Sequence, residues 1–400
     1  MDRPVKRVGL YLDAAFRRSV DGADVTLYRG AGDFGFMHFA AAVGRHFGRL
    51  SVVARETGDA NECPNALPQG LDLIPLPYYP SLRNVGRVLM AMPRTFGAMW
   101  RALADLDAVW VTGVHPFGLV LAVLGRFRRK RVVLLIRQDS PRYFRHRSSG
   151  ILGLLAAPFV FVLDLAFRML ARRLPTTVVG AHVAERYGAP RPNVLEMHIN
   201  LLSAGDVVSR PSEADWSERV ALLTVGRIDR EKNPMIVPAV LEGLERRAPG
   251  RFHLTWVGEG PLAESLEQEV ARRGLADRLT LPGYVPFGPA LIERYRSAHA
   301  FVHIALTEGV PQVLFEAMGS GLPIVATDVG GVAPALERGV AGLLVPPDDP
   351  GAVSAAILRL AGDADLRLNL ATRALELAAR ETIESESDRV AAFIRGNGEA

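Results

Sequence analysis

Two carboxylates, a turn into a helix and several glycines gather in the stretch 303–331, HIALTEGVPQVLFEAMGSGLPIVATDVGG. Glu308 stands in the loop before a predicted helix and Glu316 lies inside that helix, so both side chains can face a ligand held at the helix start. A carboxylate in such a place accepts hydrogen bonds from hydroxyl groups, which suggests a sugar or a ribose. For an isolated glutamate pair, the alternative is two surface acids on and before an amphipathic helix.

The start of the same helix predicts a phosphate site. Apolar spacing indicates a helix over Gln312–Met318 that opens at Pro311, a residue favoured in a first helical turn. The free N–H groups and the positive dipole end of such a helix attract a phosphate, and Gly309 lets a ligand approach the backbone. The flanking runs, 301–305 and 322–327, are typical of buried parallel strands.

A second group of charged residues follows a strand further back in the chain. The run RVALLTVG predicts a strand, and RIDREKNP follows it before the next helix. Arg227 and Lys232 therefore stand at the carboxyl end of a strand and at a helix entrance, which is where a diphosphate would bind. The alternative is a basic turn in solvent, which the joint occurrence with the Glu308 motif makes weaker.

Together these motifs resemble the signature of the retaining nucleotide-sugar glycosyltransferases of family four, which have the GT-B fold. The resemblance is carried by E-x7-E with AMGSGLPIVATDVGG after it, and by G-R-x-x-x-E-K-N. It implies that Glu308 contacts the donated sugar, that Glu316 holds the donor ribose, and that Arg227 and Lys232 contact the diphosphate. Backbone groups implied in donor binding are those of Gly226, Gly309, Val310, Pro311, Gln312 and Val313.

Other positions are implied by the same resemblance. Tyr284 and Val285 are candidates for holding the base, although Tyr284 in the core is the alternative. A glycine-rich loop before the first helix, with Gly32, Asp33 and Gly35, takes the place of the family's glycine loop, although a plain turn is nearly as good an explanation.

The chain also departs from the family pattern. Val332-Ala333 replaces the Pro-Glu that often follows the two glycines, and Arg137-Gln138 stands where many relatives carry a histidine. His115, at the end of another strand, is the candidate for that catalytic role, and a structural histidine is the alternative.

Length and composition favour a two-domain globular protein. The chain has 400 residues, of which 49% are hydrophobic and 22% charged, and a formal net charge of +4. The single Cys63 excludes an internal disulfide and a multi-cysteine zinc site, which fits a reducing cytoplasm. No secretory signal is expected at the start, because the first residues lead directly into a strand.

Alternating strands and helices predict two doubly wound parallel sheets, as in GT-B proteins, facing each other across a cleft. We expect an acceptor-side domain at 1–205, a linker at 206–218 and a nucleotide-sugar-binding domain at 219–380. The remaining residues, 381–400, are expected to break at ETIESESD and to end in a helix, RVAAFIR, that returns to the first domain.

The first half also carries basic and apolar runs that suggest a membrane surface. Basic residues cluster at 126–131 and again at 142–147, and the most apolar stretch is 151–174. Pro158, Asp164 and an arginine interrupt that stretch, so a buried or interfacial helix is expected rather than a spanning one. An ordinary solvated basic surface is the alternative.

The sequence therefore predicts a retaining, metal-independent glycosyltransferase in the cytoplasm, with peripheral attachment to the inner face of the cell membrane as a further hypothesis. Its donor would be a nucleotide diphosphate sugar, with no other cofactor and no nucleic-acid partner, and its acceptor a glycan, a lipid-linked sugar or a small molecule, as in cell-envelope polysaccharide synthesis. No convincing metal site is present in the sequence, since Asp348-Asp349 lies in a proline-rich loop. The alternatives are a GT-B epimerase or phosphorylase, and a sugar-nucleotide-binding protein that has lost catalysis.

Overall fold

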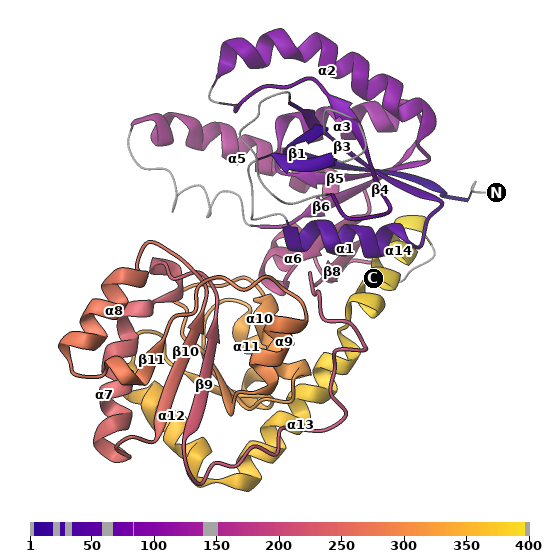
Figure 1. The fold of residues 1–400 in the computed structure, drawn as a ribbon. Coiled ribbons are helices and arrows are strands. Elements are labelled where there is room, and N and C mark those ends of the chain that lie inside the picture. Colours follow the sequence, from indigo (N-terminus) through magenta and orange to yellow (C-terminus); the bar gives the residue numbers. More distant parts are fainter. Residues whose placement is uncertain are drawn as a thin grey trace. The chain divides into compact units, whose positions relative to one another are not determined.

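The computed structural model describes residues 4–18, 25–28, 34–57, 67–82, 84–138 and 151–396. The chain divides into two compact units (Figure 1). Unit 1 consists of Met1–Leu201 with Ile383–Ala400, and unit 2 of Leu202–Thr382. Each unit is built on a largely parallel sheet with helices, which confirms the predicted fold class. Residues 206–218, expected to be a linker, are part of unit 2.

The sheet of unit 1 has the order β4-β3-β1-β5-β6-β7-β8, with every pair along this path parallel, and β2 pairs with β1 antiparallel. Its strands are β1 (Arg7–Arg18), β2 (Val25–Tyr28), β3 (Arg49–Glu56), β4 (Leu71–Leu76), β5 (Ala108–Gly113), β6 (Arg131–Ile136), β7 (Thr176–Val179) and β8 (Val194–Met197). Because the strands are parallel, the carboxyl ends of β4, β3, β1 and β5 lie at one edge of the sheet.

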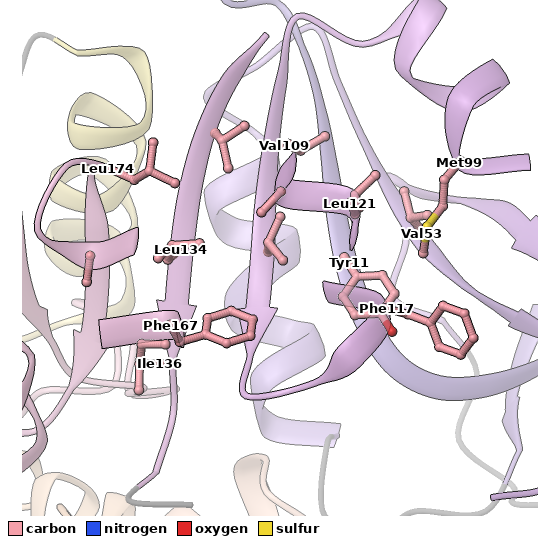
Figure 2. Close-up of a cluster of buried hydrophobic side chains, with 14 of the residues drawn as sticks. Tyr11, Val53, Met99, Val109, Phe117, Leu121, Leu134, Ile136, Phe167 and Leu174 are labelled. Carbon is pink, nitrogen blue, oxygen red and sulfur yellow. The ribbon is translucent and has the colours of Figure 1, made fainter. Parts of the chain in front are cut away.

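The helices of unit 1 are α1 (Phe34–Gly44), α2 (Val85–Asp105), α3 (Pro116–Phe127), α5 (Ile151–Ala171), α6 (Ala181–Tyr187) and α14 (Ile383–Arg395). Side chains of α2, α3, α5 and α6 pack with those of the sheet in one buried cluster, which Figure 2 shows in part. Helices α1 and α14 pack against each other (Figure 1). The last helix is thus part of unit 1 although its sequence comes after unit 2.

The sheet of unit 2 has the order β11-β10-β9-β12-β13-β14, and all its pairs are parallel. The strands are β9 (Val220–Val225), β10 (Phe252–Val257), β11 (Leu279–Thr280), β12 (Ala300–His303), β13 (Ile324–Thr327) and β14 (Leu343–Val345). Along β9, Val220 and Leu222 belong to one buried cluster and Leu223 and Val225 to another, as expected for a strand covered on both faces.

The helices of unit 2 follow the same division into two faces. Helices α7 (Val237–Arg247), α8 (Ala263–Arg272) and α12 (Pro350–Gly362) supply the first cluster, α9 (Pro289–Arg296), α10 (Gln312–Gly319) and α11 (Val332–Ala335) supply the second, and α13 (Ala364–Arg380) contributes to both. Short 3-10 helices are η2 (Arg230–Lys232), η3 (Pro234–Ile236), η4 (Ala276–Arg278) and η5 (Glu337–Gly339). The predicted helix Gln312–Met318 is thereby confirmed to within one residue.

Two local predictions are wrong. The expected break over ETIESESD does not extend past Thr382, because α14 begins at Ile383. Acidic residues in its first turn interact favourably with the helix dipole and stabilise the helix start. Glu386 also accepts a hydrogen bond from the His198 backbone N–H at 3.1 Å. Gly35 lies in the first turn of α1 rather than in a loop. Glycine destabilises a helix less in this first turn than in the helix interior. Gly32 lies outside the described residues.

Candidate functional site

The loop after β9 is shaped by a glycine and by a capping aspartate. Gly226 has φ +149°, a conformation that L side chains rarely adopt, and its N–H donates to Val257 O at 3.0 Å. Asp229 caps η2: its Oδ1 accepts from the N–H groups of Glu231 at 3.1 Å and of Lys232 at 3.3 Å. These contacts position the Lys232 side chain beside the loop that follows β12.

Lys232, Glu308 and His303 form what we call the Lys232 cluster. The Lys232 Nζ donates a hydrogen bond to Glu308 Oε1. His303 is the last residue of β12, and its Nε2 lies 3.2 Å from the same oxygen. Two residues predicted from separate motifs are therefore in contact, and His303 joins them from the strand end.

The electrostatics of this cluster keep the carboxylate ionised. Burial acts to raise the pKa of Glu308, but the nearby His303 and Lys232 outweigh it, so the pKa is lowered. Burial lowers the pKa of His303, with Lys232 acting in the same direction and Glu308 against it. At neutral pH the cluster thus consists of a neutral imidazole, a carboxylate and an ammonium group.

Close backbone packing holds the Glu308 loop in place. A Cβ at Gly330 would lie 1.9 Å from Glu308 O, and one at Gly331 would lie 2.2 Å from Gly309 O. The Gly331 N–H donates to Gly309 O at 2.8 Å. The two glycines after β13 therefore permit close backbone contact between the two loops. A side chain at either position would displace the loop that carries Glu308.

Glu316 has a different environment from Glu308. It lies in the middle of α10 and is only 4% exposed, and the Tyr295 hydroxyl of α9 donates to its Oε2 at 2.7 Å. Burial raises its pKa to about 7, against which the Tyr295 hydrogen bond acts weakly. The start of α10 has Pro311 at the N-cap and no side chain that caps it; the Leu314 N–H donates to Pro311 O at 3.1 Å, and the N–H groups of Gln312 and Val313 face the helix start, where a ligand can reach them.

The other predicted donor residues lie around these loops with varied exposure. The Arg227 side chain is 73% exposed and its Nε lies 3.4 Å from Asp229 Oδ2. Tyr284 is 64% exposed, so the alternative of core packing is wrong for its side chain. Its N–H donates to Glu259 Oε1 at 3.3 Å, and Val285 is half-buried against the second cluster of unit 2.

Unit 1 has a second polar group at the carboxyl ends of its central strands, which we call the Asp13 cluster. Its members are Asp13, Tyr11, Arg55, Tyr79 and His115. Asp13 Oδ1 accepts from the Tyr79 hydroxyl at 3.0 Å and lies 3.2 Å from an Arg55 nitrogen, while Oδ2 lies 3.3 Å from His115 Nε2. The β1–β3 register shifts between Tyr11 and Ala15, so Asp13 sits on an irregularity of the kind that re-aims side chains near functional sites.

His115 is held on both sides by this cluster. Its Nδ1 lies 2.8 Å from the Tyr11 hydroxyl, and its Nε2 faces Asp13. Burial lowers the pKa of His115, and the Asp13 carboxylate opposes this shift. The side chain of Asp13 is 37% exposed against 10% for His115, so the carboxylate is the more accessible group. His115 therefore fits a positioning role better than direct contact with a ligand.

Several of these residues were not among the sequence-based candidates. His303 and Asp13 carried a weaker signal. His303 lies in the predicted strand 301–305, two residues before its carboxyl end, and Asp13 directly follows the apolar run VGLYL, whereas parallel sheets bind ligands beyond the carboxyl ends of their strands. Arg55 and Tyr79 carried none, since arginine and tyrosine at strand ends are common and their partner is more than twenty residues away. In the ranges that the structure describes, no group of three or more His, Cys, Asp or Glu side chains is placed to hold a metal ion.

In the comparison with known proteins, the family match lies within unit 2. Residues 219–363 match the family model described as Glycosyl transferases group 1. Over 185 residues the chain is 32% identical to Alpha-D-kanosaminyltransferase of Streptomyces kanamyceticus, covering 45% of this chain and 47% of the relative. The chain thus spans about half the length of the curated relatives it matches.

Two solved structures resemble the whole chain at low identity. Sucrose-phosphate synthase from Thermosynechococcus elongatus superposes with a TM-score of 0.67 at 17% identity, covering 98% of both chains. HepE from Anabaena, in complex with UDP and glucose, gives 0.65 at 17% identity and covers 97% of this chain and 98% of its own. This likeness establishes the fold, which is the two-domain GT-B architecture of glycosyltransferases.

Proposed function

Because residues 219–363 form a domain of the group 1 glycosyl transferases, we propose that this protein transfers a sugar from a nucleotide diphosphate sugar to an acceptor hydroxyl. The observation that carries the proposal is the Lys232 cluster beside the uncapped start of α10. It brings a cation, an ionised carboxylate and free N–H groups together in one unit. A diphosphate needs the cation and the N–H groups, and a sugar needs the carboxylate.

In this proposal, charge on the leaving diphosphate is offset without a divalent ion. Lys232, Arg227 and the N–H groups at the start of α10 form a fixed positive environment, and fixed dipoles cost no reorganisation during reaction. Glu308 accepts hydrogen bonds from the donated sugar, and Glu316 from the donor ribose. Gly226, the backbone at Val310–Val313, and Tyr284 with Val285 complete the donor contacts by backbone approach. We propose that transfer retains the configuration at the anomeric carbon, as the motif resemblance implies.

Unit 1 supplies the acceptor side in this proposal. The Asp13 cluster presents a half-exposed carboxylate at the edge of a parallel sheet, and both of its oxygens are already oriented by other side chains. An oriented carboxylate accepts hydrogen bonds from hydroxyl or amino groups and repels anions. This favours a glycan, lipid-linked or small-molecule acceptor that presents neutral or amino groups at this point.

Attachment to the inner face of the cell membrane is a further part of the proposal, and cell-envelope polysaccharide synthesis is the process that it fits. The basic run 126–131 and helix α5 motivated it, and the second basic run, 142–147, lies outside the described residues. Helix α5 presents Phe159, Phe161 and Val162 to solvent. No helix in the part of the chain that the structure describes is long and apolar enough to cross a membrane.

The deciding experiment uses the full chain and a panel of nucleotide sugars. Equilibrium binding, donor hydrolysis and transfer to simple sugar acceptors are measured separately, and UDP-glucose is a sensible first donor because HepE was solved with UDP and glucose. We expect one donor to bind, to be turned over slowly without acceptor, and to give a product of retained configuration by NMR. Binding without any turnover would identify a protein that has lost catalysis, and a sugar product without transfer would identify an epimerase or phosphorylase.

A further inference from the structure

Helix α2 exposes large apolar side chains along its outer face. Its buried side is made by Ala91, Thr95, Met99, Ala102 and Leu103. On the opposite side Met90 is 72% exposed, and Val85, Leu89 and Trp100 are also exposed. A surface helix normally carries polar residues on the side away from the core, so this helix departs from the usual pattern. Contiguous exposed apolar side chains mark an interaction site.

Arginines flank the apolar stripe at regular spacing. Arg87, Arg94 and Arg101 are seven residues apart, which places them on nearly the same side of the helix, and all three are exposed. The sequence contains no aspartate or glutamate between Leu73 and Ala104. Asp105, the exposed last residue of α2, is the one acid of the helix, so the outer side of α2 combines apolar groups with three arginines along its length and a single acid at its end.

The end of α3 extends the same surface. The Arg128 guanidinium lies 4.0 Å from the centroid of the Trp100 ring, so the end of α3 adjoins the second half of α2. Phe127 is 77% exposed, and Arg126 and Arg129 beside it are exposed as well. We define the α2–α3 face as the exposed side chains of Val85, Arg87, Leu89, Met90, Arg94, Trp100, Arg101, Arg126, Phe127 and Arg129.

We propose that the α2–α3 face is the surface by which this protein docks on an anionic lipid bilayer, with α2 lying in the plane of the interface. Apolar side chains would enter the acyl boundary while the arginines meet the phosphate groups of the lipids. The predominance of arginines on this face is complementary to anionic headgroups. A nucleic acid would not use exposed Leu, Met and Phe side chains, and a protein partner gives no reason for five exposed arginines beside the apolar side chains.

Helix α5 is the competing surface within unit 1. Its outer side exposes Phe161, Val162, Leu165 and Met169, but among the residues that the structure describes around α5 exposed arginines stand only at its end, after Ala171. The α2–α3 face has arginines along its whole length. It also lies close in sequence to the Asp13 cluster, since only a few residues separate Tyr79 from the start of α2. Docking there would bring the cluster near lipid-linked acceptors.

The test is vesicle co-sedimentation of the full chain, with phosphatidylcholine vesicles that contain or lack phosphatidylglycerol. We expect binding to the anionic vesicles only. Binding should fall as salt rises, because the Debye length shortens from roughly 30 Å at about 0.01 M to roughly 3 Å at about 1 M. The variant Arg87→Gln/Arg94→Gln/Arg101→Gln should lower the partition coefficient by at least about tenfold.

Matched variants separate this surface from general charge and apolarity. Arg246→Gln/Arg247→Gln/Arg359→Gln removes the same charge from exposed positions of α7 and α12, and should leave binding within about twofold. Met90→Ser/Phe127→Ser should weaken binding about tenfold or more, whereas Val340→Ser/Leu368→Ser, also exposed, should not. Circular dichroism is used to check that each variant remains folded.

Three results would overturn the inference. They are no binding to anionic vesicles at low salt, equal loss in the matched charge controls, and loss with Phe161→Ser/Leu165→Ser/Met169→Ser on α5 while the α2 variants still bind. Concentration-dependent self-association abolished by Met90→Ser/Phe127→Ser would assign the face to a protein interface instead. Donor binding is measured on the same variants and should not change, so failure of the membrane inference is distinguishable from failure of the proposed transferase function.

Discussion

The two units carry similar groups at corresponding places and differ in how these groups are assembled. The Lys232 cluster and the Asp13 cluster each combine a buried histidine, a carboxylate and a cation at the carboxyl ends of parallel strands. In the first, the histidine ends strand β12 and the carboxylate stands five residues later in the loop that follows it. In the second, Asp13 lies in strand β1 and His115 at the N-cap of α3, after strand β5. Similar chemistry is thus built from a local motif in unit 2 and from tertiary contacts in unit 1.

The two carboxylates also differ in their exposure and in how their oxygens are shared among partners. The side chain of Glu308 is 12% exposed and one of its oxygens serves both Lys232 and His303. Asp13 is 37% exposed, and its two oxygens are divided among Arg55, Tyr79 and His115. We infer that the Lys232 cluster exchanges partners when a charged donor binds, whereas the Asp13 cluster is already complete and acts as a rigid platform.

The largest effect is expected from Lys232→Ala. It removes a charge-assisted contact to the donor diphosphate worth about 1.5–3 kcal/mol and leaves the Glu308 carboxylate without its cation. Donor affinity measured by calorimetry should fall by roughly one to two orders of magnitude. Arg230→Ala, an exposed arginine on the same 3-10 helix, is the matched control and should change affinity little.

Arg227→Ala extends this test to the more exposed cation. Because its side chain is largely in solvent, the loss should be smaller than for Lys232→Ala, about tenfold or less. If neither variant changed donor affinity while both remained folded by circular dichroism, the assignment of the Lys232 cluster to the diphosphate would be wrong, and with it the division of work between the two clusters.

A pH effect of comparable size is expected from Glu316. Its folded pKa of about 7 lies above the ordinary value of 4.5, so the folded state holds the proton more tightly. Stability from this group is therefore fully present below about pH 4.5 and is lost as the pH rises through about 7, to an extent of roughly 2–3 kcal/mol. Urea unfolding from pH 5 to 8 should show this loss, and Glu316→Gln should remove it.

Tyr295→Phe sharpens the same measurement. The Tyr295 hydroxyl stabilises the ionised carboxylate, so its removal should raise the pKa of Glu316 further and move the loss of stability to higher pH. Glu308, whose pKa is lowered, should give no such loss in this range. A Glu316→Gln profile that follows the wild type would show that the carboxylate is not the group responsible.

A smaller effect on stability is expected from Asp13→Asn. The amide keeps the size of the carboxylate but loses the charge opposite the buried Arg55, which should cost about 1–2 kcal/mol in the free energy of unfolding. Transfer to acceptor should fall while donor affinity stays within about twofold, since Asp13 belongs to unit 1. A drop in donor affinity equal to that of Lys232→Ala would contradict the separate roles of the two clusters.

The smallest change is expected on chelation. Because side chains and a helix start are assigned to offset the diphosphate charge, turnover in EDTA should equal turnover in buffer. The assay follows nucleotide release with the best donor of the panel. Complete loss restored by Mg²⁺ or Mn²⁺ would assign charge neutralisation to a divalent ion and leave the Lys232 cluster with a supporting role.

The sequence by itself determined the doubly wound fold and most of the donor-side candidates. Strand–helix alternation is a local pattern, and a residue at the end of a parallel strand must lie at the ligand-binding edge wherever the strand is placed. Glu308 and Lys232 follow strands β12 and β9, which are neighbours in the sheet. Their contact therefore follows from the order of the strands. The assigned roles of these residues stay predictions until the variants are measured.

Only the tertiary structure decided which groups are buried and what they contact. The raised pKa of Glu316 comes from its burial on α10 beside Tyr295 of α9, and the Asp13 cluster needs the neighbouring strands β3 and β5 in register with β1. Burial and pKa depend on side chains that approach from distant parts of the chain, and a local sequence pattern carries no information about those approaches. For the same reason the apolar residues of α2 can be read from the sequence, but their exposure to solvent is known only from the fold.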